Sequence, residues 1–164
     1  MTFLRCGAGL VAVMFAGAGT AWSQTPAAAG RIKISSGQAS IVREGKEVPA
    51  KAGELVYQAD VLKTGADGRL GVTLRDESQI SLGPTSEVRV DRFVYAPAEG
   101  NLGMALRIAR GIVAYVSGRI AKLAPDAVRL ETPAAIVGVR GTRLVIQAGS
   151  QAPAAATQTK TRKS

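Results

Sequence analysis

The central stretch of the chain, residues 55–95, is a series of short apolar runs separated by turn sequences. Apolar and polar residues alternate within each run, and the runs recur eight residues apart, as in the series Val72, Ile80, Val88 and Leu74, Leu82, Val90. Alternation with a period of two places every second side chain on one face of a strand. Turns at such short intervals are typical of all-β proteins. We therefore expect an all-β fold, either a compact two-layer sandwich or a short solenoid-like β-roll of many short strands.

The eight-residue spacing continues more loosely beyond this stretch. Further steps of eight reach only apolar residues, namely Ala96, Met104, Ile112, Ile120, Val128, Ile136 and Leu144. Because 46% of the chain is hydrophobic, part of this regularity is chance. The spacing therefore indicates short strands without giving their order in a sheet.

Residues 104–116 fit both a helical face and a pair of strands. Gly111 in the interior would weaken a helix by about 1 kcal/mol relative to Ala, and the β-branched residues that follow it favour strand. We predict two strands, broken at Arg110-Gly111. Residues 96–103, which precede them, are expected to be the longest polar connection of the domain.

The N-terminal residues have the pattern of a secretory signal peptide. Arg5 precedes an apolar run over residues 7–19, and the small residues Ala21 and Ser23 stand at the positions that a signal peptidase favours. The run is shorter than the roughly 20 residues of a spanning helix. We expect residues 1–23 to be removed, with no retained membrane span, which predicts a periplasmic or secreted protein of a Gram-negative envelope.

Three further segments follow the predicted signal peptide. Residues 24–30 are interpreted as a linker, residues 31–148 as the β domain, and residues 149–164 as a disordered basic tail. The tail has no large apolar residue, so it cannot offset the entropy that ordering costs.

Nucleophilic and metal chemistry have few candidate residues here. The chain has no His, and its one Cys, Cys6, lies in the predicted signal peptide, which excludes Ser-His-Asp, Cys-His and ordinary zinc sites. The neighbours Asp76 and Glu77 are expected to be solvated in a turn, and Asp60 to cap a turn of its own. We therefore predict that the protein is not an enzyme and uses no cofactor and no metal.

The chain is strongly basic, with a formal net charge of +9. A basic balance raises nucleic acid as a partner, but predicted export and an aromatic content of only 4% argue against it. Anionic envelope polymers such as lipopolysaccharide or acidic polysaccharides would be accessible partners. A solvated basic surface without a dedicated ligand is the simpler alternative.

Four arginines are candidates for contacting a partner: Arg107, Arg110, Arg140 and Arg143. Arg140 lies in a glycine-flanked turn, where its guanidinium could hold a carboxylate or phosphate. The alternative is an internal ion pair with Asp60 or Glu131. Arg107 and Arg110, with Arg143 nearby, could form a basic patch or simply belong to a solvated charged face.

Several short motifs together resemble the FecR-type periplasmic domain, named after the iron-dicitrate regulator. They are G-x-A/V-x-V-x-R-x-G at residues 37–45, Asp60, T-G at 64–65, D-G-R at 67–69, D-x-S at 76–78, L-G-P-x-S at 82–86 and T-P-A…G-V-R-G-T at 132–142. The likeness covers residues 37–146. The sequence departs from it at two turn positions, since Ala59 and Glu77 stand where the family often has Gly.

The best-known members of this family are inner-membrane anti-sigma regulators whose periplasmic part contacts a receptor. This sequence shows neither a cytoplasmic head nor a retained span, so the resemblance implies a stand-alone exported module. Its expected function is non-enzymatic binding or scaffolding, with a link to envelope signalling, and its partner would be an envelope protein or an anionic polysaccharide. The alternative is a structural or assembly component of the envelope without a dedicated ligand.

Overall fold

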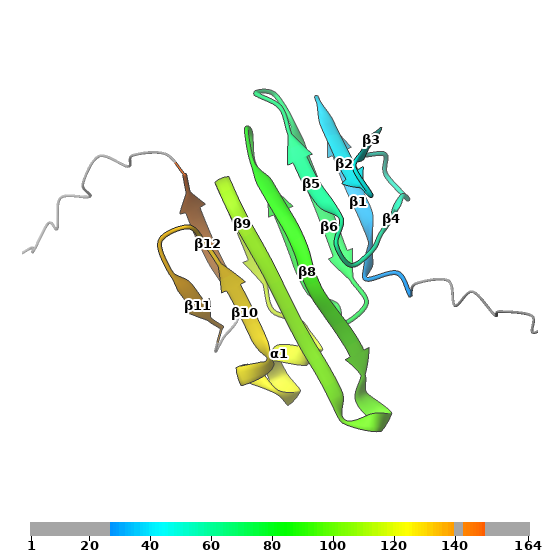
Figure 1. The fold of residues 1–164 in the computed structure, drawn as a ribbon, viewed down its shortest axis with the longest axis vertical. Coiled ribbons are helices and arrows are strands. Elements are labelled where there is room, and N and C mark those ends of the chain that lie inside the picture. The colour runs from blue at the N-terminus through cyan, green and yellow to red at the C-terminus, as the bar shows by residue number, and fades with distance from the viewer. Residues whose placement is uncertain (1–26, 140–142, 150–164) are drawn as a thin grey trace, which may run out of the picture.

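The computed structural model describes residues 27–139 and 143–149 (Figure 1). The predicted signal peptide, Arg140 and residues 150–164 of the predicted tail lie outside this part of the chain. The described residues form twelve strands, one α-helix and two 3-10 helices, so the all-β prediction is confirmed. The elements are β1 (Gly30–Ser36), β2 (Ala39–Arg43), β3 (Lys46–Pro49), β4 (Leu55–Val56), β5 (Val61–Thr64), β6 (Arg69–Leu74), β7 (Gln79–Leu82), β8 (Glu87–Ala96), η1 (Pro97–Glu99), β9 (Asn101–Val116), α1 (Arg119–Leu123), η2 (Pro125–Ala127), β10 (Val128–Glu131), β11 (Ile136–Gly138) and β12 (Arg143–Ala148).

The strands make one sheet that curls into a half-barrel, with two halves that share β9 (Figure 1). Half A contains β4, β1, β6, β7, residues 111–116 of β9, and β12. Half B contains β3, β2, β5, β8, residues 101–110 of β9, β10 and β11. All of these pairings are antiparallel except that of β10 with β9. The arrangement therefore differs from a solenoid, whose successive coils stack in parallel.

Strand β9 passes from half B to half A at Gly111. Before this residue β9 pairs with β8 and β10, and from this residue onward it pairs with β7 and β12. Gly111 has a φ of +93°, a conformation that L side chains rarely adopt. The prediction of two strands broken at this glycine is wrong, because Gly111 bends one continuous strand of 16 residues.

The core lies between the two halves and collects the inward-facing residues of both. The six residues of the two eight-residue series are all exposed by 2% or less, which confirms the alternation. The looser continuation is not a structural repeat, because Ile112 is 47% exposed and Ile136 is 69% exposed. The predicted long connection over residues 96–103 is also wrong, since β8 and β9 form a hairpin around the short helix η1.

The two turn positions that depart from the FecR-type pattern have left-handed backbone. Ala59 has a φ of +71° and Glu77 a φ of +69°. Side chains in this region strain the backbone by about 1 kcal/mol or more, whereas Gly adopts it freely. Gly is therefore the conformationally favoured residue at these two turns, and this chain has Ala and Glu there in spite of the strain.

We expect Ala59→Gly to raise the free energy of unfolding by about 0.5–1 kcal/mol, because the relieved strain outweighs the added freedom of the unfolded chain. Urea denaturation measures the change. Ala52→Gly is the matched control: Ala52 is exposed and has no positive φ, so the same substitution there should destabilise. Equal losses of stability in both variants would contradict the explanation.

Candidate functional site

The Arg of the first family motif, Arg43, forms an ion pair with Asp60 in which Asp60 is buried and Arg43 is half-buried. Asp60 is 1% exposed, and its carboxylate accepts hydrogen bonds from Nε and Nη2 of Arg43 at 2.9 and 2.8 Å. It also accepts the backbone N–H of Tyr57 at 2.8 Å, and the Arg43 guanidinium lies 4.5 Å from the centre of the Tyr57 ring. The hydrogen bond to Asp60 raises the pKa of Arg43. Asp60 thus pairs with Arg43, and Arg140, its suggested partner, lies outside the described residues.

Asp76 is fully buried, so the prediction that it is solvated in a turn is wrong. Its carboxylate accepts hydrogen bonds from the hydroxyl of Ser78 at 2.7 Å, the backbone N–H of Ser78 at 3.1 Å and the backbone N–H of Ile120 at 3.4 Å. Only Glu77 is exposed, with an ion pair to Arg119 at 2.8 Å. Asp76 therefore fastens the β6–β7 turn to the start of α1.

Ser78 extends this cluster into the core. Its hydroxyl oxygen accepts the backbone N–H of Gly118 at 2.9 Å and lies 3.1 Å from the hydroxyl of Tyr115. Burial raises the pKa of Tyr115 to about 12. Asp76, Ser78 and Tyr115 are each exposed by 1% or less, so a substrate cannot reach them. The cluster is an internal anchor of the fold.

A second polar cluster joins the turn before β8 to β9. The Thr64 hydroxyl donates to the carbonyl of Gly83 at 2.7 Å and accepts the backbone N–H of Ser86 at 2.9 Å. The Ser86 hydroxyl in turn accepts the backbone N–H of Ile112 at 3.1 Å, beside the bend at Gly111. The motifs of the family resemblance up to residue 86 therefore supply polar contacts that connect separate turns and strands of the fold.

Arg107 and Arg110 lie on β9 in half B, and carboxylates pair with both. Arg107 contacts Asp91 at 3.1 Å and Glu131 at 3.3 Å. Arg110 contacts Glu87 at 3.2 Å. Their charges are therefore balanced within the same outer face.

Arg143 is not near these two residues. It is exposed at the start of β12, opposite Val116, which is six positions beyond Arg110 on β9. At the rise of an extended strand this separation is about 20 Å. The structure thus does not assemble Arg107, Arg110 and Arg143 into one patch, and Arg140 lies outside the described residues.

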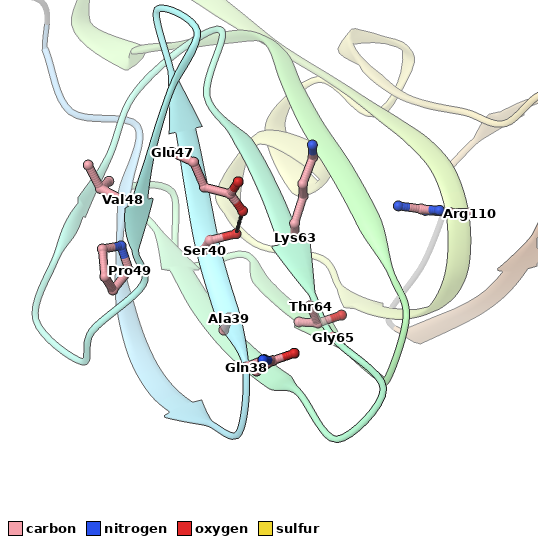
Figure 2. A pocket seen from close by; sticks show the side chains of 10 residues that line it. All are labelled: Gln38, Ala39, Ser40, Glu47, Val48, Pro49, Lys63, Thr64, Gly65 and Arg110. Atoms are coloured by element: carbon pink, nitrogen blue, oxygen red, sulfur yellow. Dashed lines mark hydrogen bonds between the residues drawn. The ribbon is translucent and has the colours of Figure 1, made fainter.

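A hollow of about 500 Å³ opens on the outer face of half B, over β2, β3 and β5, with Arg110 at one side (Figure 2). Within it, the hydroxyl of Ser40 donates to Glu47 at 2.5 Å. Lys63 projects into the same space and has no ion pair within the described part of the chain (Figure 2). Because Glu47 and the ion-paired Arg110 line it as well, the hollow has mixed charge.

The outer face of half A has a different charge pattern. Its strand segments contain no Asp and no Glu, but they carry four exposed cations: Arg31, Lys33, Arg69 and Arg143. None of these has an ion pair or a side-chain hydrogen bond among residues 27–139 and 143–149. The charged side chains on these strands are therefore all positive, and no carboxylate of the described residues neutralises them.

The centre of this face carries no charged side chain. One row across successive strands is Arg31, Thr73, Gln79, Val116 and Arg143, and the next is Ile34, Gly71, Ser81, Ala114 and Val145. The two arginines at the ends of the first row are separated by four strand spacings, about 19 Å. We call the outer face of half A, with its four cations, the cationic face. Of the four arginines proposed from sequence, only Arg143 lies on it among the described residues.

Sequence reasoning missed Arg31, Lys33 and Arg69. The feature that could have identified them is that no strand of half A contains Asp or Glu. This feature can be recognised only when it is known which strands belong to half A. Among the described residues, no group of three or more His, Cys, Asp or Glu could hold a metal ion. No helix within this part of the chain has the length and apolar character needed to cross a membrane.

A family model described as FecR protein matches residues 60–160. The match begins at Asp60, whose partner Arg43 lies 17 positions before the matched range. Searches of curated proteins and of solved structures return no match.

Proposed function

The chain belongs to the FecR protein family, and on this premise we propose that it is an exported, periplasmic, non-enzymatic binding module of the cell envelope. The family is related to signalling and regulation, which fits a domain that recognises a partner. The signal-peptide pattern of residues 1–23 supports export.

The cationic face is the surface that binds the partner in this proposal. The observation that carries it is that four cations lie on strands without a single acidic residue and have no ion pair within the part of the chain that the structure describes. An anionic partner gains attraction from each cation without first having to displace an internal carboxylate. The outer face of half B would attract an anionic partner less strongly, because Arg107 and Arg110 already have carboxylate partners.

The partner is an envelope protein or an anionic polysaccharide. Four cations spread around an uncharged centre suit an extended anionic surface better than one small ligand held at a single point. No enclosed cluster of reactive groups in the described residues opens to solvent, since Asp76, Ser78 and Tyr115 are buried. A binding role is therefore favoured over catalysis.

The test compares two triple variants with equal loss of positive charge. Arg31→Gln/Arg69→Gln/Arg143→Gln removes three cations from the cationic face, and Arg89→Gln/Arg107→Gln/Arg110→Gln removes three ion-paired arginines from half B. Binding of the exported chain to immobilised lipopolysaccharide and peptidoglycan is measured over a range of salt. We expect the first variant to lose about tenfold or more in affinity, at roughly 0.5 kcal/mol or more for each exposed contact.

The half-B variant is expected to retain most of its affinity. Equal losses in both variants would show that only the net charge matters and would contradict the assignment of the face. A wild-type chain that binds neither polymer would exclude the polysaccharide as partner.

A further inference from the structure

We propose that β12 pairs edge to edge with β12 of a second copy of this chain, forming an antiparallel two-fold dimer. Within the described residues, β12 forms backbone pairs with β9 alone, so its other edge is open. An open edge presents a row of N–H and C=O groups that can extend the sheet with another strand.

The edge of β12 lacks the features that usually prevent such pairing. It has six residues, contains no Pro, and carries its only charge, Arg143, at its first position. Charged residues, Pro and very short strands are the common protections of sheet edges. The strand is therefore long enough and regular enough to accept a partner.

The other edge strands of the described sheet are protected. β3 carries Lys46 and Glu47 and ends in Pro49, β4 has two residues, and β11 has three. Among the strands that end the sheet, this contrast singles out β12 as the edge available for pairing.

The sequence of β12 is compatible with a copy of itself. Antiparallel pairing centred on Val145 places Val145 opposite the Val145 of the second copy, and Arg143 opposite Gln147. No like charges then lie directly opposite, a placement that would be destabilising. Val145 is 68% exposed, and the pairing would cover part of this apolar surface. A two-fold axis uses the same residues on both copies, so one strand provides the whole contact.

Pairing would also double the cationic face. The outer faces of the two copies would join into one sheet with eight unpaired cations, which would strengthen binding to a long polyanion through avidity. This consequence rests on the proposed function, whereas the dimer itself does not.

The experiment measures the molar mass of the exported chain in solution, by light scattering or sedimentation, without any ligand. The wild type is expected to have twice the mass of one chain. Val145→Lys and Val145→Asp should each be monomers, because like charges meet at the two-fold axis. An equimolar mixture of these two variants should regain the dimer mass, because opposite charges then meet.

Ile34→Lys is the control, since Ile34 is 64% exposed in the same row of the cationic face but on β1. This variant should remain dimeric. A monomeric wild type, a dimer that survives Val145→Lys, or a mixture that stays monomeric would each overturn the proposal. A monomeric wild type that still binds polymer through the cationic face would leave the proposed function intact and reject the dimer alone.

Discussion

Gly111→Ala is expected to lower the free energy of unfolding by about 4 kcal/mol. Two costs add: the left-handed backbone strains any L side chain by about 1–3 kcal/mol, and the new methyl group overpacks the joint by about 1–3 kcal/mol. The Cβ would collide with both the side chain and the Cα of Ser86, whose hydroxyl fixes the backbone of Ile112 at 3.1 Å. Chemical denaturation followed by circular dichroism measures the loss.

Gly100→Ala provides the matched control. Gly100 has a similar left-handed conformation, with a φ of +66°, but no atom lies within 4 Å of the position of its added Cβ. Only the backbone cost remains, about 1 kcal/mol. A loss at Gly111 no larger than the loss at Gly100 would show that the bend in β9 can relax around the extra methyl group.

Arg43→Ala should destabilise the domain by about 3 kcal/mol, the cost of breaking a buried pair by removing one partner. Asp60, which is 1% exposed in the wild type, would lose the positive charge that compensates its own. The carbonyl of Leu55, which accepts a hydrogen bond from Arg43 at 2.8 Å, would lose this partner as well. Equilibrium denaturation in urea is the measurement.

Arg89→Ala is the comparison for this prediction. The Arg89 side chain is 51% exposed and pairs with Asp91 at 3.0 Å, and exposed pairs of this kind are worth about 0–1 kcal/mol. A double-mutant cycle of Arg43→Ala with Asp60→Ala isolates the coupling between the two partners. A coupling near zero would mean that Asp60 is held by the Tyr57 N–H instead.

The strands of residues 55–95 could be predicted because the alternation of apolar and polar residues within each strand shows which side chains face the core. Val72, Ile80 and Val88, which this alternation places inward, are buried. The same local signal fails at Ile112, which has the right spacing but lies on the outer side of β9. The bend at Gly111 occurs just before it, and a period of two carries no information about a change of sheet partners.

Contacts between distant residues were not visible in the sequence. Arg43 and Asp60 are 17 positions apart, and the Asp76 carboxylate accepts a hydrogen bond from Ile120, 44 positions away. Turn chemistry alone suggested a solvated carboxylate for Asp76 and a local turn cap for Asp60. Their burial depends on which donors the fold brings to them, and no local pattern encodes that.

The candidate site was only partly predictable for the same reason. Arg143 was selected from its surroundings in the sequence, and it lies on the cationic face. Arg107 and Arg110 were selected in the same way, yet they face Asp91, Glu131 and Glu87 on neighbouring strands. Whether a surface arginine is free or neutralised depends on strand order.

Because β9 pairs with strands of both halves of the sheet, we expect the two halves to open together. Removing the whole of this strand from the sheet would break its pairs with β7 and β12 in half A and with β8 and β10 in half B. The domain is thus built to unfold as one cooperative unit, with amide hydrogens on both sides of Gly111 exchanging through the same global opening. A partner that binds half A alone would for this reason protect half B from unfolding.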